Sequence, residues 1–242
     1  MGYLRRAFFR SFLIQSSWNF ERMQSLGFFY SIAPALKSIY KNREGLEKAS
    51  RRHLEFFNTN PYMAPAIIGA TIRMEEDGAS DEEIRGLKVG LMGAYGAIGD
   101  SLFWASLRPL AAVIGVAFAL HGFLWAPIVF FVIYNIPHIF IRGYGMVMGY
   151  RMGPGVVNAV KGLDIPARAQ KIKAGILFVA GFLLSLLLSM VALMMKGSFD
   201  ILIFMIFISS VLGFYLGLEK GIKVELLAFL AVPVSLVLGL FI

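Results

Sequence analysis

The chain has 242 residues, of which 58% are hydrophobic and only 16% are charged, and its mean hydropathy is +0.71. A soluble globule needs more polar surface than this composition supplies, so the sequence predicts an integral membrane protein. The net charge of +8 comes from basic residues grouped beside apolar segments. That pattern orients a chain at anionic headgroups and does not indicate nucleic-acid binding. The absence of cysteine excludes disulfides, thiol catalysis and thiolate metal sites.

The N-terminal segment from Tyr3 to Ile14 is amphipathic. Arg6 and Arg10 lie one helical turn apart, and Leu4 with its neighbouring apolar residues fills the adjoining rows. A helix of this kind lies in a membrane interface with its arginines toward phosphate. A cleaved signal peptide is disfavoured, because no small-residue cleavage site follows a long apolar core.

Residues 1–84 as a whole predict several short amphipathic helices on the cytoplasmic face of the membrane, because no window supplies the roughly 20 apolar residues of a span. Asn58, Thr59 and Asn60 precede a proline and should break a helix, either as an ordinary turn or by pointing amides into the gap. Ser80 is expected to be an N-cap, with Glu83 at the capping-box position.

Residues 85–141 form a glycine-rich region in which Asp100 and Arg108 stand in an apolar context. Isolated charges in hydrocarbon are costly and mark functional sites. The stretch 111–141 has no charged residue, but His121-Gly122, Pro127, Asn135 and Pro137 should interrupt it. Broken helices at membrane depth need protein or a cavity around them, so we expect one or two broken or re-entrant helical hairpins.

Residues 142–173 contain six basic residues with glycine and proline throughout and predict a cytoplasmic loop. Residues 174–242 then predict about three transmembrane helices. The alternation of charge places the N-terminus in the cytoplasm and the C-terminus outside. The predicted fold is an all-α membrane protein with interfacial N-terminal helices, a broken hairpin region and a C-terminal set of spans.

No catalytic motif is present: the sequence has no Walker loop, GxSxG or HExxH. The three-residue spacing of Gly93, Gly96 and Gly99 is more typical of close helix contact than of phosphate binding. His53 beside a basic run is more often structural than a phosphocarrier, and no two of the three histidines form a close ligand pair. We expect no catalytic residue, no metal and no other cofactor.

Several long segments resemble the IID membrane component of the mannose/fructose/sorbose-type sugar phosphotransferase system. They lie in matching order over about the first 160 residues. The segments are QSSWNFERMQSLGFFYSIAPAL, RHLEFFNTNPYMAPAIIGA with the following MEE, GLKVGLMGAYGAIGDSLFWASLRPL and the region of Asn135. The chain departs from the family at Ala94-Tyr95-Gly96, where members usually carry a turn of Pro-Leu-Ala type.

The resemblance implies a multi-pass subunit of the bacterial cytoplasmic membrane that joins a IIC partner, in several copies, to translocate a hexose or amino sugar. Cytoplasmic IIA and IIB proteins are the implied phosphocarriers, and a phosphohistidine of IIB donates its phosphoryl group to the sugar. The IID subunit itself is not phosphorylated. The alternative is a regulatory or scaffold subunit of an incomplete system, which assembles without transporting.

The resemblance also implies which residues line the sugar path, because sugar hydroxyls need amide and carboxylate partners and sugar faces stack on aromatic rings. The expected substrate contacts are Asn58, Asn60, Asp100, Ser101, Trp104 and Arg108. The alternative for Asp100 and Arg108 is an ion pair or a helix cap. Their spacing is about two helical turns, so a direct pair requires a broken helix, or else each finds another partner.

Overall fold

The structure is a computed structural model that describes residues 2–157. The three predicted C-terminal spans and the predicted loop beyond residue 157 lie outside the described residues. The elements are α1 (Gly2–Arg10), η1 (Ser11–Leu13), α2 (Ser25–Ile39), α3 (Arg43–His53), α4 (Ala64–Glu76), α5 (Asp81–Gly99), η2 (Asp100–Leu107), α6 (Arg108–Leu120), α7 (Ala126–Met152) and η3 (Gly153–Gly155). Every element of this part is helical, and only isolated bridges pair in the β manner. The all-α prediction is confirmed for the described residues.

Helices α1 to α4 are short, with 9 to 15 residues each, and no candidate span begins before Asp81 in the described part. Local signals in the sequence set their ends. Asn42 caps α3 by accepting from the Gly45 amide at 3.0 Å, and the capping box predicted at Ser80 and Glu83 is present at the start of α5. These caps satisfy amides that a helix start leaves unpaired.

The core lies where α2, α4 and α5 meet. Its largest fully buried side chains are apolar and come from these three helices and the loops beside them. They include Phe28, Ile32, Leu36, Phe57, Ile67, Ile68, Ile72, Ile84 and Leu91. Burying each such side chain contributes roughly 1.5–3 kcal/mol, so this core holds the short helices together.

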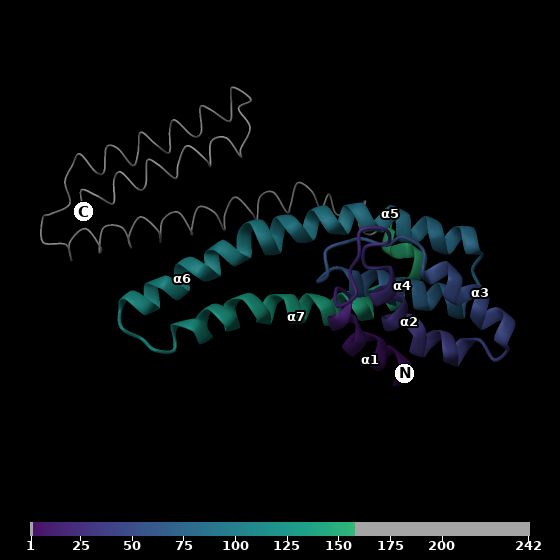
Figure 1. Cartoon of the computed structure of the whole chain (residues 1–242), viewed down its shortest axis with the longest axis horizontal. Coiled ribbons are helices and arrows are strands. Elements are labelled where there is room, and N and C mark those ends of the chain that lie inside the picture. The colour runs from purple at the N-terminus through teal and green to yellow at the C-terminus, as the bar shows by residue number, and fades with distance from the viewer. Residues whose placement is uncertain (1, 158–242) are drawn as a thin grey trace, which may run out of the picture. The chain divides into compact units, whose positions relative to one another are not determined.

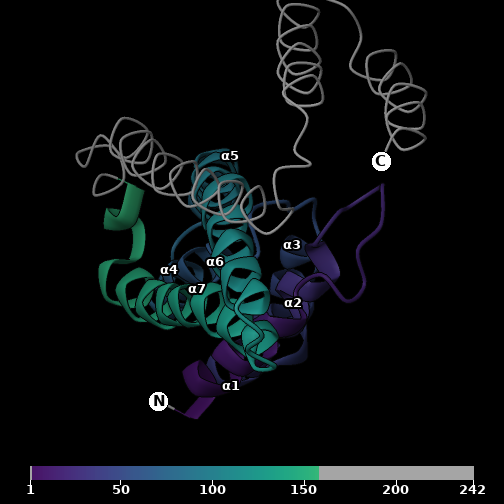
Figure 2. The same ribbon diagram turned by 90° about the vertical axis from the view of Figure 1, so that its left-hand side faces the viewer.

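Two long helical segments follow: Asp81–Leu120, which combines α5, η2 and α6, and Ala126–Gly155, which combines α7 and η3. Both are long and apolar enough to cross a membrane by length and composition. The first extends roughly 60 Å, about twice the hydrocarbon thickness, so a membrane would cover only part of it. Its charged beginning packs against α4. Figure 1 shows α6 and α7 running side by side toward their connecting turn, away from α1 to α4, and Figure 2 looks at this hairpin end-on.

Helices α4 and α7 cross closely because glycines meet at the contact. A methyl group on Gly69 would collide with the Met146 carbonyl oxygen, and one on Gly149 would collide with the Ala66 carbonyl oxygen. Small residues let two backbones approach in this way. The short N-terminal part is thereby joined to the second long helix.

The predicted interruptions were partly right. His121-Gly122 does end α6, with Gly122 at φ +79°, and Pro127 stands in the first turn of α7. The breaks predicted at Asn135 and Pro137 are wrong, because α7 runs unbroken through both. Proline is tolerated inside a packed membrane helix, and the Asn135 amide donates to the Phe131 carbonyl at 2.7 Å.

Two further segments singled out from the sequence are helical in the structure. The first part of the predicted basic loop, Arg142–Met152, is instead the C-terminal part of α7. Arg142 is buried within this helix, whereas its charge had led us to expect an exposed loop residue. The triplet at residues 94–96, where the chain departs from the family pattern, lies inside α5 with the Tyr95 ring buried.

Candidate functional site

The polar loop between α3 and α4 is held by a glutamine from the segment that precedes α2. The Gln24 side chain donates to the Thr59 carbonyl at 2.7 Å and accepts from the Thr59 amide at 3.1 Å. Thr59 also donates its hydroxyl proton to the Met92 carbonyl of α5 at 2.9 Å. The loop is therefore ordered by side chains that satisfy its backbone, as a buried irregular segment requires.

Asn60 is the central residue of this loop and is 1% exposed. Its side-chain oxygen accepts from the Tyr62 amide at 3.0 Å, which is the turn predicted before the proline. Its carbonyl accepts from the Met63 and Ala64 amides and so leads into α4. The side-chain oxygen of Asn60 thus forms the turn, while its side-chain nitrogen points away from the turn toward a second partner.

That nitrogen donates to the Asp100 carboxylate at 2.9 Å, and we call these two side chains the amide–carboxylate pair. Gly99 makes the contact possible, since a methyl group at this position would collide with the Asn60 side chain. Gly96 faces the same loop at ordinary contact distance, whereas Gly93 faces open space. The close packing predicted from the glycine spacing is therefore present at Gly99 alone among the three positions.

Asp100 is exposed and begins η2, a π-helical stretch of eight residues. Its second carboxylate oxygen has no hydrogen bond to any other described residue. A π-helical insertion widens the turn and is often found at functional sites. It also resolves the question left by Asp100 and Arg108: the helix does not break, and the carboxylate finds Asn60 as its partner instead.

The other predicted contacts are distributed around the pair. Ser101 is the next residue in η2, and Trp104 lies about one turn farther along with 40% of its surface exposed. Asn58 is exposed on the same loop, where its backbone amide meets the Met92 sulfur at 3.2 Å. Arg108 is exposed at the start of α6, about two turns beyond Asp100, and is not brought to the pair.

Sequence reasoning missed an aromatic cluster beside the pair, centred on Tyr62. The Tyr62 ring stacks on His138 at a centroid distance of 4.4 Å and meets the edge of Phe103 at 4.8 Å. Its hydroxyl lies 2.8 Å from that of Tyr134. His138 and Tyr134 are four residues apart on α7, a spacing that could have shown a shared face.

A second group of polar side chains is centred on Glu75, and we call it the Glu75 hub. The Glu75 carboxylate is fully buried and accepts from Tyr40 at 2.6 Å, Arg52 at 2.5 Å and His53 at 2.6 Å. Arg52 also pairs with the Asp81 carboxylate. The hub joins α2, α3, α4 and α5, so its role is to connect these helices.

Burial lowers the pKa of His53 to about 4, and the hydrogen bond to Glu75 offsets only part of this effect. Burial alone would raise the pKa of Glu75, but hydrogen bonds from His53, Tyr40 and Arg52 outweigh it and hold the pKa at about 2. At neutral pH the hub therefore contains a neutral imidazole and an ionised carboxylate.

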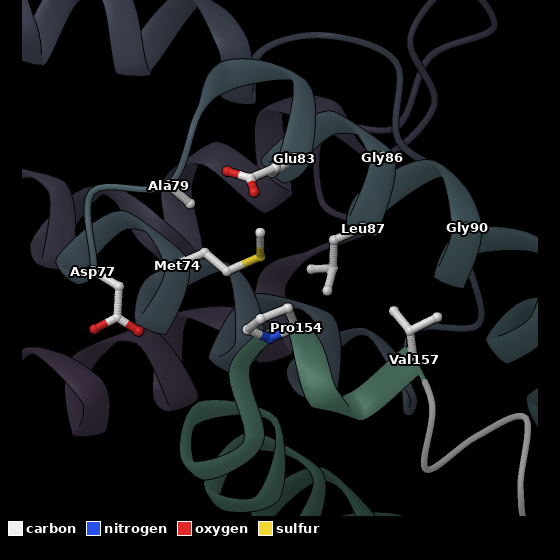
Figure 3. A pocket seen from close by; sticks show the side chains of 9 residues that line it. All are labelled: Met74, Asp77, Ala79, Glu83, Gly86, Leu87, Gly90, Pro154 and Val157. Carbon is white, nitrogen blue, oxygen red and sulfur yellow. The ribbon is translucent and has the colours of Figure 1, made fainter.

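A cavity of about 360 Å³ lies between the end of α4, the start of α5 and η3. Figure 3 shows Met74, Leu87 and Val157 lining it, together with the carboxylates of Asp77 and Glu83. Both carboxylates are already engaged, the first with Arg73 on α4 and the second in the cap of α5. The lining is otherwise apolar, which does not suit a sugar.

The comparisons with known proteins agree with one another. The family model described as "PTS system mannose/fructose/sorbose family IID component" matches residues 2–196. The chain is 42% identical over 188 residues to the mannose-specific EIID component of Escherichia coli K12, covering 75% of this chain and 66% of the relative. It is 39% identical over 189 residues to the sorbose-specific EIID component of Klebsiella pneumoniae, covering 76% and 69%.

Solved structures give the same result. A cryo-EM structure of the mannose transporter ManYZ in complex with microcin E492 matches with a TM-score of 0.62 at 40% identity, over 77% of this chain and 69% of that one. A second structure, described only as a membrane protein, matches with a TM-score of 0.68 at the same identity and coverage. The chain spans about two thirds of the length of the E. coli relative. On the strength of the family model and these relatives, the chain belongs to the IID components of the mannose/fructose/sorbose family of the phosphotransferase system.

Proposed function

We propose that this chain forms, with a IIC partner, the membrane unit that translocates a sugar while phospho-IIB phosphorylates it. The observation that carries the proposal is the amide–carboxylate pair, which stands on a helix long and apolar enough to span a membrane and beside an exposed tryptophan. Removing a carboxylate from water in such a helix costs free energy, so a carboxylate kept there marks a functional site. In a chain of this family, the use that fits best is recognition of a hexose or amino sugar.

Each predicted contact has a role in this proposal. Asp100 offers its second carboxylate oxygen to a sugar hydroxyl, and Asn60 holds the first oxygen and so orients the group. Ser101 and Asn58 add a hydroxyl and an amide, and Trp104 supplies a surface on which a sugar ring stacks. A sixth contact, Arg108, lies about two turns away and would reach only the far end of the path.

The phosphoryl group is supplied by the cytoplasmic partners in this proposal, not by this chain. Support comes from His53, which is 0% exposed and bound through Nε2 to Glu75. A buried imidazole that already donates to a carboxylate is inaccessible to a phosphoryl donor. No group of three or more histidine, aspartate or glutamate side chains that could hold a metal ion occurs in the part of the chain that the structure describes. In this proposal the chain is a non-catalytic subunit.

The proposed location is the bacterial inner membrane, with the N-terminal helices on the cytoplasmic side and the C-terminus outside. In this arrangement α1 lies in the interface. Its Ala7 is buried against the core, and Phe9 is 64% exposed beside exposed arginines. Side chains of this kind suit acyl chains and phosphates. The exposed apolar faces of α6 and α7 would be covered by lipid and by several copies of IIC.

The test is uptake of radiolabelled mannose, fructose and sorbose, the sugars named for the relatives. The chain is expressed with its IIA, IIB and IIC partners in a strain that lacks its own mannose-type permease. Transport predicts uptake that requires this chain, together with recovery of IIC and this chain as one complex from detergent. The regulatory or scaffold alternative predicts the same complex with no uptake of any of the three sugars or of the amino sugar glucosamine, and that result would refute the transport proposal.

A further inference from the structure

Arg142 is a buried cation in the middle of an apolar helix. It lies in α7 and is only 4% exposed. Its Nη1 donates to the Ser11 carbonyl at 3.1 Å, and its Nε is buried without a hydrogen-bond partner. No carboxylate forms an ion pair with it in the part of the chain that the structure describes. A guanidinium is rarely kept in such surroundings for packing alone.

Two aromatic rings take the place of a carboxylate. The guanidinium carbon lies 4.7 Å from the centroid of the Phe12 ring and 5.2 Å from that of the Tyr62 ring. A planar guanidinium is attracted to the faces of aromatic rings within about 6 Å, and the attraction grows when water is excluded. Arg142 therefore links the N-terminal segment to the loop that carries the sugar-site candidates.

The Tyr62 ring is held from α7 by three side chains in one helical row, at positions 134, 138 and 142. Tyr134 shares a hydrogen bond with its hydroxyl, His138 stacks on its face, and Arg142 adds the cation. From η2, Phe103 packs against the ring edge. A ring with this many neighbours has one position available to it.

The position of Tyr62 is transmitted directly to Asn60. The Tyr62 amide donates to the Asn60 side-chain oxygen at 3.0 Å, and the nitrogen of that same side chain donates to Asp100 at 2.9 Å. A shift of the ring moves the amide, and with it the orientation of the carboxylate. The chain of contacts from Arg142 to Asp100 is thus continuous through packed groups.

We propose that Arg142 is a positioning residue for sugar recognition, which acts by fixing Tyr62 and, through it, the amide–carboxylate pair. The proposal rests on the proposed function for the identity of the ligand. It does not require Arg142 to touch the sugar. Lysine would keep the positive charge but has no planar face for the two rings, so Arg142→Lys separates this role from charge alone.

The first test is the concentration dependence of the initial rate of [14C]mannose uptake, or of whichever of the three sugars the wild type transports. Arg142→Lys is expected to raise the apparent KM about tenfold, equivalent to about 1.4 kcal/mol, with the maximal rate within about twofold. Arg151→Lys is the matched control, since that arginine is exposed near the end of the same helix. Phe12→Leu removes one of the two rings and is expected to raise KM by about threefold.

A merely structural role gives a different result: the amount of complex in the membrane falls and KM stays unchanged. That outcome would overturn the proposal. If Arg142→Lys does not accumulate, Phe12→Leu decides, because this ring is 41% exposed and its removal leaves the core intact. An unchanged KM in Phe12→Leu then refutes the inference.

The second test does not depend on transport. The chain has no cysteine, so Asn58→Cys introduces a single attachment site for a nitroxide on the loop. In the purified complex with IIC, Arg142→Lys is expected to increase the mobility of this nitroxide, and Arg151→Lys to leave it unchanged. Unchanged mobility in Arg142→Lys overturns the inference whatever the uptake assay shows. By contrast, a normal KM in Asp100→Asn with increased nitroxide mobility in Arg142→Lys would mean that the sugar site is wrong and the positioning right.

Discussion

The Glu75 hub provides a sharp test of how the short helices are held together. Glu75→Gln keeps the shape of the side chain and removes its charge. The native Glu75 side chain is 0% exposed and accepts three hydrogen bonds, one of them from Arg52, whose side chain is 3% exposed. Glutamine presents an NH2 group where at least one of these donors points. Asp81, whose side chain is 21% exposed, is then the remaining ion-pair partner of Arg52 in the described part of the chain.

Removing one partner of a buried ion pair costs about 3–5 kcal/mol, and Asp81 compensates part of this, so we expect a loss of about 3 kcal/mol. For a chain of this size, that loss lowers the melting temperature by about 6–12 °C. The assay is thermal unfolding in detergent, followed by the intrinsic fluorescence of the three tryptophans.

Glu47→Gln is the matched control, because it breaks an exposed pair on α3 between Glu47 and Arg51. Exposed pairs spaced four residues apart contribute only about 0.3–0.5 kcal/mol, so its melting temperature should change by less than about 2 °C. If Glu75→Gln unfolds within this same interval of the wild type, the hub does not stabilise the fold as described here.

Three further predictions concern stability and the site. The unfolded chain protonates His53 near pH 6.5 and the folded chain only near pH 4. The contribution of neutral His53 to the free energy of unfolding is therefore complete above pH 6.5 and is lost as the pH falls toward 4. The melting temperature should drop from pH 7 to pH 5, and His53→Gln should remove most of this drop; an unchanged slope would contradict it. Gly99→Ala should lose sugar uptake at normal levels of complex, because the methyl group displaces the amide–carboxylate pair, whereas Gly93→Ala, which faces open space, should transport normally. Gly149→Ala should push α4 and α7 apart locally and cost about 1–3 kcal/mol, whereas Gly143→Ala, at ordinary contact distance, should cost little; equal melting temperatures would refute this.

Local signals in the sequence predicted a large part of the fold. The capping box at Ser80 and the turn before Pro61 depend on neighbours in the chain and were correct. The helix end at His121-Gly122 belongs to the same class. The breaks expected at Asn135 and Pro137 failed, because a proline ends a helix only where its surroundings do not compensate, and those surroundings are tertiary.

The candidate site shows the same limit. Asn60 and Asp100 were expected to serve one sugar path, and the structure joins them by a hydrogen bond that no spacing along the chain could show. Tyr62 and Arg142 were overlooked, since a tyrosine after a proline and an arginine near a basic stretch look like surface residues in a sequence. Tyr62 is partly buried and Arg142 is buried. The two meet because α4 and α7 cross, which brings together residues far apart in the chain.

The central claim is that the amide–carboxylate pair recognises the transported sugar. It is tested most directly by the concentration dependence of initial sugar uptake by Asp100→Asn in the assembled complex. Asparagine keeps the size of the side chain but loses the charged acceptor, so the apparent KM should rise about tenfold or more, since a hydrogen bond to a charged group contributes about 1.5–3 kcal/mol. A complex that assembles normally and transports with the wild-type KM would contradict the account.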